Sequence, residues 1–170
     1  MKALIEFTRT SFEGENPSPF GGAVYDNETG ECIAQAYDTV MADGNPLAHG
    51  EMNAIRLACA ERKSLSLSGC TLYSTCEPCP MCMSGSIWAE LDAVYYGAST
   101  QEDANVYWPQ PSNITPQDLV NGTKDHIGIT VVPDFLRPLC AQLFVDCDAA
   151  RVEKGLANPP NREEGSVSSQ

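Results

Sequence analysis

Hydrophobic and polar positions follow different periods in the first part of the chain. Apolar side chains within residues 1–12 predict a short helix. This helix should end at residues 14–19, which are rich in Gly, Asn and Pro. The next two apolar segments, FGGAVYD at 20–26 and CIAQAYD at 32–38, flank the turn-forming residues NETG. This arrangement predicts a β-hairpin.

A helical period follows the hairpin. Apolar residues recur three or four positions apart, with charged residues between them, at Ala48, Met52, Ile55 and Cys59. This spacing predicts a helix over residues 48–63.

Strand-like and helical segments alternate in the middle of the chain. CTLYST (70–75), DAVYYGA (92–98) and GITVVP (128–133) predict strands, and Pro80 suits the first turn of a helix that continues to residue 90. Strands separated by helices imply parallel crossovers with helices on the faces of the sheet. We therefore expect an α/β fold, a three-layer α/β/α sandwich.

Residues 99–124 break this alternation. They combine three prolines with polar residues and the aromatic pair Tyr107 and Trp108. A long irregular connection of this kind often covers a functional site. We expect the 105–112 loop to take part in the choice of substrate and Trp108 to contact the substrate.

The last apolar stripe predicts a C-terminal helix. Asp134 is the expected N-cap, Pro138 must fall in the first turn, and the stripe consists of Leu136, Leu139, Leu143 and Cys147. From residue 154 onward the chain has almost nothing to bury. We expect one domain over residues 1–153 and a disordered tail over residues 154–170.

Charge and composition narrow the classes of function. A formal net charge of −13 with a pI near 4.3 weighs against a nucleic-acid substrate, because phosphate backbones attract basic proteins. The N-terminus lacks the apolar core of a signal peptide, and no stretch approaches the roughly 18 apolar residues of a membrane helix. We expect a soluble, cytoplasmic protein without a membrane partner, in which the eight cysteines are thiols or metal ligands.

Two short motifs carry the candidate chemistry. HGEMNAI starts with His49 at the beginning of one predicted helix, and CEPCPMC places Cys79 and Cys82 at the beginning of the next. A catalytic zinc ion takes three protein ligands such as His and Cys and leaves a fourth position for water. The N-termini of consecutive crossover helices lie side by side at the carboxyl end of a sheet. We therefore expect these three residues to bind Zn²⁺.

Glu51 lies two residues after His49, where its carboxylate can reach a water on the metal without binding the ion. Taken alone, a CxxC pair is often a redox motif, a structural zinc site or part of a core, and a His near a Glu often forms only a helix-terminal hydrogen bond. Together they match the H-x-E and P-C-x-x-C pattern of zinc deaminases. We expect Cys76 to be a packed thiol and His126 to lie in a surface loop.

Around these motifs the sequence resembles the cytidine and deoxycytidylate deaminase-like superfamily, and within it the group of guanine deaminases, tRNA adenosine deaminases and fungal cytosine deaminases. The resemblance covers roughly half of the chain, in PFGGAVYD (19–26), NPLAHGEMNAIRLAC (45–59), LYSTCEPCPMCMSGSIWA (72–89) and AVYYGA (93–98). It implies a five-stranded mixed sheet between helices, a homodimer, zinc held by His49, Cys79 and Cys82, and Glu51 as the proton shuttle.

The same resemblance implies a base pocket. In this pocket the backbone amide of Gly50 would hold a ring acceptor, and the side chains of Phe20 and Trp88 would line the base. Asp38 stands where guanine and adenosine deaminases have an Asn, and an ionised Asp only accepts hydrogen bonds. A substrate with more donors would suit it. The HGE motif is the form seen in cytosine deaminases, whereas guanine and tRNA enzymes usually have HAE.

Three functions are compatible with these residues. The favoured one is hydrolytic deamination of a small nucleobase or nucleoside, with guanine or a related purine ahead of cytosine or an aminotriazine. The second is adenosine deamination in tRNA, against which the net charge weighs. The third is a structural zinc module without activity, which would have no use for Glu51 beside an open metal position.

Overall fold

The computed structural model describes residues 1–110, 113–123 and 128–156 of the chain. His126 and most of the predicted tail, residues 157–170, lie outside the described residues. No helix in the described part of the chain is both long enough and apolar enough to cross a membrane.

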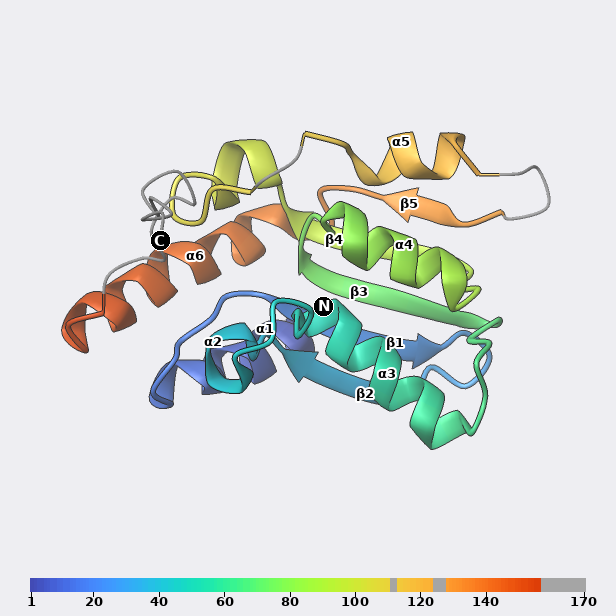
Figure 1. Cartoon of the computed structure of the whole chain (residues 1–170), viewed down its shortest axis with the longest axis horizontal. Helices are drawn as coiled ribbons and strands as arrows, with labels where there is room; N and C mark the ends of the chain where they lie inside the picture. The colour runs from blue at the N-terminus through green and yellow to red at the C-terminus, as the bar shows by residue number, and fades with distance from the viewer. Residues whose placement is uncertain (111–112, 124–127, 157–170) are drawn as a thin grey trace, which may run out of the picture.

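A mixed sheet, five-stranded within the described residues, forms the centre of the molecule (Figure 1). In the spatial order β2-β1-β3-β4-β5, the strands are Cys32–Tyr37, Gly21–Asp26, Cys70–Cys76, Ala93–Ala98 and Thr130–Val132. β1 runs antiparallel to both of its neighbours, whereas β3, β4 and β5 are parallel. β2 and β3 therefore point the same way, and their carboxyl ends lie at the same end of the sheet.

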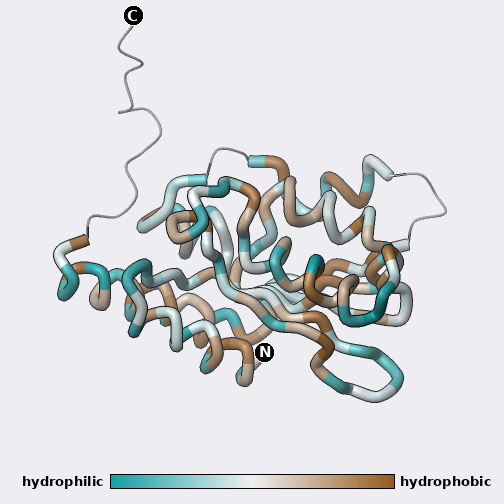
Figure 2. Tube along the Cα trace, turned by 60° about the horizontal axis from the view of Figure 1, so that its bottom comes forward, coloured by the Kyte–Doolittle hydropathy of each residue, from teal (hydrophilic) through white to brown (hydrophobic). Residues whose placement is uncertain are grey.

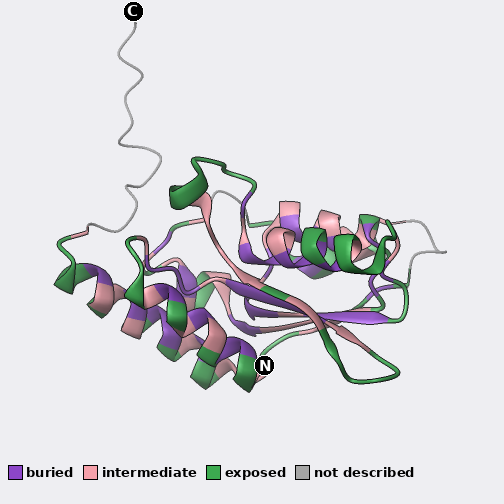
Figure 3. Ribbon diagram, turned by 90° about the horizontal axis from the view of Figure 1, so that it is seen from below, coloured by how far each residue is buried: buried purple, intermediate pink, exposed green. Residues whose placement is uncertain are grey.

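Helices cover both faces of this sheet (Figure 3). The helical segments are α1 Lys2–Arg9, η1 Thr10–Glu13, α2 Val40–Asp43, α3 Gly50–Arg62, α4 Pro80–Trp88, the π-helical η2 Thr100–Ala104, α5 Pro116–Asn121 and α6 Arg137–Glu153. One core holds Leu72 of β3 and Met83 of α4, and a second core holds Cys76 of β3 and Phe144 of α6. Hydrophobic stretches occur on both the strands and the helices, and they alternate with hydrophilic ones along the helices (Figure 2). The three-layer α/β/α sandwich is confirmed.

Elements with a clear hydrophobic period form where the sequence predicts them. β1 and β2 make the predicted hairpin, and α3 occupies the range predicted from its apolar spacing. Pro80 and Pro138 both lie in the first turn of their helices, where a missing backbone N–H costs nothing.

The predicted N-cap of the last helix is wrong. Leu136 is the N-cap of α6, with a φ of 58°, and Asp134 has the same left-handed φ. The Asp134 carboxylate accepts a hydrogen bond from Nη1 of Arg137 at 3.4 Å. The chain therefore turns sharply before the helix starts, and a sequence pattern for a simple cap does not show such a turn.

The expectation of an irregular connection over residues 99–124 is wrong in part, because η2 and α5 lie within it. The side chain of Ser99 accepts a hydrogen bond from the amide of Glu102 at the start of η2. Thr115 and Asp118 form a reciprocal capping box at the start of α5. These segments are too short and too polar to show a helical period, but their capping residues are visible in the sequence.

Candidate metal centre and catalytic pocket

Two helix N-termini meet at the carboxyl end of β2 and β3. His49 is the N-cap residue of α3, which follows β2, and Cys79 is the N-cap residue of α4, which follows β3. Cys82 lies in the first turn of α4. Because β1 runs antiparallel between these strands, its first residue, Gly21, lies at the same end. The crossover therefore brings His49 beside cysteines that are 30 and 33 positions away in the sequence.

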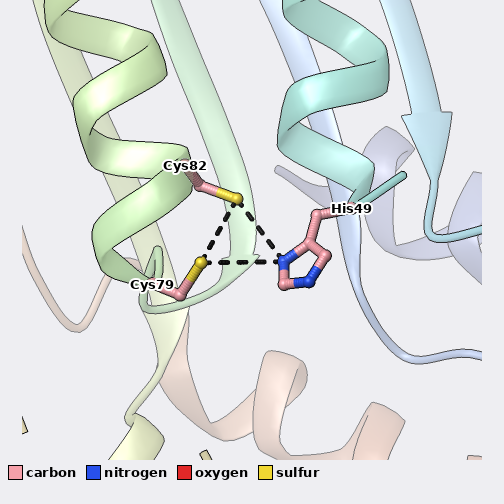
Figure 4. Close-up of side chains that lie close together, drawn as sticks. All are labelled: His49, Cys79 and Cys82. Carbon is pink, nitrogen blue, oxygen red and sulfur yellow. Dashed lines mark hydrogen bonds between the residues drawn. The ribbon is translucent and has the colours of Figure 1, made fainter. Parts of the chain in front are cut away.

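The side chains of His49, Cys79 and Cys82 point toward one another (Figure 4). Nδ1 of His49 lies 3.7 Å from Sγ of Cys79 and 3.5 Å from Sγ of Cys82, and the two sulfurs are 3.6 Å apart. A tetrahedral zinc ion with ordinary bond lengths separates its ligand atoms by about 3.6–3.8 Å. The cluster thus has both the donor types and the spacing of a three-ligand zinc site.

Hydrogen bonds within the cluster shift its pKa values. The contact between the two sulfurs is the main cause that lowers the pKa of Cys79 to about 4 and raises the pKa of the buried Cys82. The hydrogen bond to Cys79 raises the pKa of His49 to about 9. Zinc binds thiolates and a neutral imidazole, so it would displace the protons that these three groups share.

Glu51 lies beside this cluster in the first turn of α3. Its Oε2 is 3.5 Å from Sγ of Cys82, and Oγ of Ser74 donates a hydrogen bond of 3.0 Å to its Oε1. Burial raises the pKa of Glu51 to about 7. A carboxyl group with such a pKa can both accept and donate a proton near neutral pH. Glu51 can therefore exchange protons with a molecule held next to the cluster.

Two glycines allow the N-terminus of α3 to lie against β1. A Cβ atom at Gly22 would be 2.7 Å from Cα of Glu51, and one at Gly50 would be 2.8 Å from the carbonyl oxygen of Phe20. Real Cβ atoms do not approach other atoms this closely. Both positions therefore need glycine if Glu51 is to sit where it does.

Three further residues support the site and were not predicted from the sequence: Gly22, Ser74 and Thr75. Oγ1 of Thr75 donates to the carbonyl oxygen of Pro19 and accepts from the amide of Gly21, both at 2.8 Å, which fixes the segment that carries Phe20. The signal for Gly22 was present, because a glycine inside a strand pattern often marks a close backbone approach. Ser74 and Thr75 gave no signal, since both are ordinary residues of a predicted strand.

A cavity of about 840 Å³ opens next to the cluster. Its lining includes His49, Glu51 and Cys79 together with Phe20 and Trp108. The rings of Phe20 and Trp108 meet edge to face, with centroids 5.8 Å apart. The structure thus places two of the aromatic residues named from the sequence on the wall of one cavity.

Asp38 also lines the cavity. Its Oδ1 accepts a hydrogen bond of 3.2 Å from the amide of Val40. Burial raises the pKa of Asp38 to about 6, although the nearby His49 opposes this shift. When ionised, this carboxyl group can accept hydrogen bonds from a ligand but cannot donate them.

Two residues predicted to form the pocket, Trp88 and Gly50, are not among those that line the cavity. Trp88 is the last residue of α4, at the end of the helix remote from Cys79, and it is 85% exposed. The prediction that Trp88 lines the pocket is therefore wrong for this chain taken alone, because Trp88 lies at the other end of α4 from Cys79 and is not among the residues that line the cavity. Gly50 is buried against the segment of Phe20, between the lining residues His49 and Glu51, and the role of its backbone amide stays a prediction.

Known proteins with similar sequences include guanine deaminases and tRNA-specific adenosine deaminases. Guanine deaminase of Bacillus subtilis is 40% identical over 86 residues, which are 51% of this chain and 54% of that protein. The tRNA-specific adenosine deaminase of Aquifex aeolicus is 36% identical over 104 residues, which are 61% of this chain and 66% of that protein. The similarity to the Bacillus subtilis enzyme thus spans about half of each chain.

Similar solved structures cover more of the chain. The guanine deaminase of Nitrosomonas europaea superimposes with a TM-score of 0.75 at 25% identity, covering 87% of this chain and 82% of that one. A structure of a related mutant protein in complex with 8-azaguanine gives a TM-score of 0.77 at 25% identity, covering 87% of this chain and 81% of that one. The fold and the His/Cys/Cys cluster agree with this similarity. Residues 1–98 match the family model of the cytidine and deoxycytidylate deaminase zinc-binding region, and the chain therefore belongs to this family of zinc-binding deaminases.

Proposed function

We propose that this protein is a hydrolytic deaminase of a small amino-heterocycle, a nucleobase or nucleoside, with guanine and related purines as favoured substrates. The observation that carries this proposal is the position of Glu51, a buried carboxyl group that lies against the zinc-ligand cluster and lines the cavity. A structural zinc site normally closes with four protein ligands and has no use for such an acid.

The side chains have separate tasks in this reaction. His49, Cys79 and Cys82 would hold the zinc ion, which when bound makes water a nucleophile near neutral pH. Glu51 takes one proton from the water that attacks the amine-bearing ring carbon and delivers it to the adjacent ring nitrogen. The second proton of that water passes through the same carboxylate to the exocyclic amine. The amine leaves as ammonia, a carbonyl oxygen replaces it, and Glu51 returns to its starting state.

The cavity supports a small and uncharged substrate. Its volume of about 840 Å³ lies within the range of about 300–1,000 Å³ that small-molecule sites occupy. The ionisable residues on its wall include the acids Glu15, Asp38 and Glu51 and the base Arg151. An excess of acidic groups disfavours a phosphate backbone. Asp38 favours a heterocycle that presents more N–H donors than a substrate read by an Asn at this position.

Deamination of adenosine in tRNA is the second candidate, supported by the similarity to tRNA-specific adenosine deaminases. It predicts that inosine appears in a tRNA incubated with the protein and that this activity falls steeply as salt is added. The net charge of −13 and the acidic wall of the cavity make this candidate weaker than a free base or nucleoside.

We also propose that the chain acts as a homodimer. The exposed Trp88 on α4 supports this proposal, because a large aromatic side chain that is 85% exposed is typical of a surface that another subunit covers. Light scattering of the purified protein would measure the mass directly. A monomer at micromolar concentration would contradict the proposal.

Ammonia release from a panel of heterocycles tests the function. The zinc-loaded protein should release ammonia from at least one member of a panel of guanine, adenine, cytosine, their nucleosides and aminotriazines. Glu51→Gln should lower kcat by a factor of about 10²–10⁴ while zinc content stays unchanged. Glu61→Gln is the matched control, since Glu61 is an exposed residue of the same helix. The proposal would be overturned if no member of the panel released ammonia, or if Glu51→Gln kept full activity.

A further inference from the structure

Arg151 is a buried cation in the last turn of α6. Only 6% of the residue is exposed. The carbonyl groups at a helix C-terminus favour a positive charge there, but burial of a guanidinium is costly unless specific contacts compensate for it. The contacts of Arg151 therefore indicate what it does.

These contacts join two segments that line the cavity and lie far apart in the sequence. Nη1 of Arg151 donates a hydrogen bond of 3.2 Å to the carbonyl oxygen of Pro17, 134 positions earlier. Cζ of Arg151 lies 5.9 Å from the ring centroid of Trp108, which is within cation–π distance. Pro17, Trp108 and Arg151 all line the cavity.

Trp108 depends on α6 at two points. Its ring meets the ring of Phe144 edge to face, with centroids 5.8 Å apart. Phe144 and Arg151 are seven positions apart, so they lie on the same face of α6, two turns from each other. Phe144 supplies apolar contact, whereas Arg151 adds a charged group that attracts the face of the indole and is itself anchored to the segment before β1.

We propose that Arg151 is a positioning residue for the substrate, because it holds the indole of Trp108 and the segment around Pro17 together as one wall of the cavity. Arg151 acts through Trp108 and does not touch the reacting atoms. The inference rests on the proposed function, since this wall affects a reaction only if the substrate occupies the cavity.

The two tryptophans of the chain allow a test that needs no substrate. Trp88 is 85% exposed and Trp108 is 9% exposed, so Trp88→Phe should leave a folded protein with Trp108 as its single fluorescent tryptophan. In this background, Arg151→Met should shift the emission of Trp108 to longer wavelength and make it more accessible to acrylamide. Arg151→Lys, which keeps the charge, should restore much of the original spectrum.

Steady-state kinetics gives the second readout. The assay uses zinc-loaded protein and whichever substrate is deaminated. Arg151→Met should raise KM roughly tenfold and leave kcat nearly unchanged. The substitution removes a cation–π contact in a buried site but does not remove a group that takes part in the reaction. Arg9→Met is the matched control. Nη1 of Arg9 lies 2.5 Å from Oδ2 of Asp146 on α6, and Arg9 is not among the residues that line the cavity.

The outcomes separate this inference from the proposed function. Trp108 emission and quenching equal to those of the Arg9→Met control, or a loss of kcat without a rise in KM, would overturn the role of Arg151 and leave the deaminase assignment intact. If Arg151→Met changes the emission of Trp108 but the unchanged protein deaminates no substrate, the proposed function is refuted. The contact by which Arg151 positions Trp108 would still be supported. If Arg151→Met does not fold, Arg151→Gln carries the same comparison against Arg151→Lys.

Discussion

The metal ligands and Glu51 come from two helix N-termini at one end of the sheet, whereas the cavity wall around Trp108 is assembled from loops and the last turn of α6. At the first region, backbone geometry fixes the side chains, since Gly22 and Gly50 leave no space between β1 and α3. At the second, the side chain of Arg151 contacts both Trp108 and the carbonyl oxygen of Pro17, and so joins segments that lie far apart in the sequence. The reaction should therefore depend on rigid local geometry, and the choice of substrate on contacts between distant segments.

Removal of one zinc ligand should have the largest effect. Cys82→Ala leaves only two protein ligands, so zinc content should fall to near zero and deamination to the background of the assay. Metal analysis by mass spectrometry, with activity on the same sample, measures both. Cys76→Ala is the matched control, because Cys76 is a buried thiol in the second core and lies outside the cluster. Full zinc content in Cys82→Ala would refute the ligand assignment.

A methyl group at Gly22 should have the next largest effect. The added Cβ would meet the backbone of Glu51 at 2.7 Å, and overpacking of this kind costs about 1–3 kcal/mol of folding free energy. Gly22→Ala should therefore lower the free energy of unfolding by that amount and reduce kcat, because α3 must move away from β1. Denaturant titration and kinetics measure the two effects.

Gly128 offers the control for Gly22, since a Cβ atom there would meet nothing within 4 Å. Gly128→Ala should leave both the stability and kcat close to those of the unchanged protein. If Gly22→Ala also left stability and kcat unchanged, the close approach of β1 to α3 would not be what positions Glu51.

The same division explains how much could be predicted from the sequence. His49, Glu51, Cys79 and Cys82 were predictable because each lies in a short motif at the start of an element with a clear hydrophobic period. The roles of Ser74 and Arg151 were not, because each depends on a partner far away in the sequence: Ser74 on Glu51, 23 positions away, and Arg151 on Pro17. Trp88 was misplaced because a motif does not show that the far end of its helix lies away from the cavity.

Asp38→Asn should change the preference for substrates more than the overall rate. The substitution replaces one acceptor oxygen by an N–H donor, and a mismatched buried hydrogen bond costs about 1–3 kcal/mol. For two purines that differ in a single ring N–H, the ratio of kcat/KM values should shift roughly 10–100-fold toward the purine without that donor. Asp43→Asn is the control, because Asp43 is exposed and does not line the cavity. An unchanged ratio would remove Asp38 from substrate recognition.

The smallest effect should come from Ser74→Ala. Oγ of Ser74 donates to Oε1 of Glu51 at 3.0 Å, and a hydrogen bond to a charged group contributes about 1.5–3 kcal/mol. Gly22, Gly50 and the backbone of α3 still hold Glu51 in the variant, so only part of this free energy should be added to the activation barrier of the reaction. We therefore expect kcat to fall about tenfold and zinc content to stay unchanged. Ser66→Ala removes a hydrogen bond from a half-buried serine to the exposed Glu90, remote from the cavity, and should leave kcat unchanged. If kcat of Ser74→Ala fell as far as that of Glu51→Gln, side-chain contacts and not the backbone would position the carboxyl group of Glu51. The metal centre and the wall around Trp108 would then not differ in how their side chains are held.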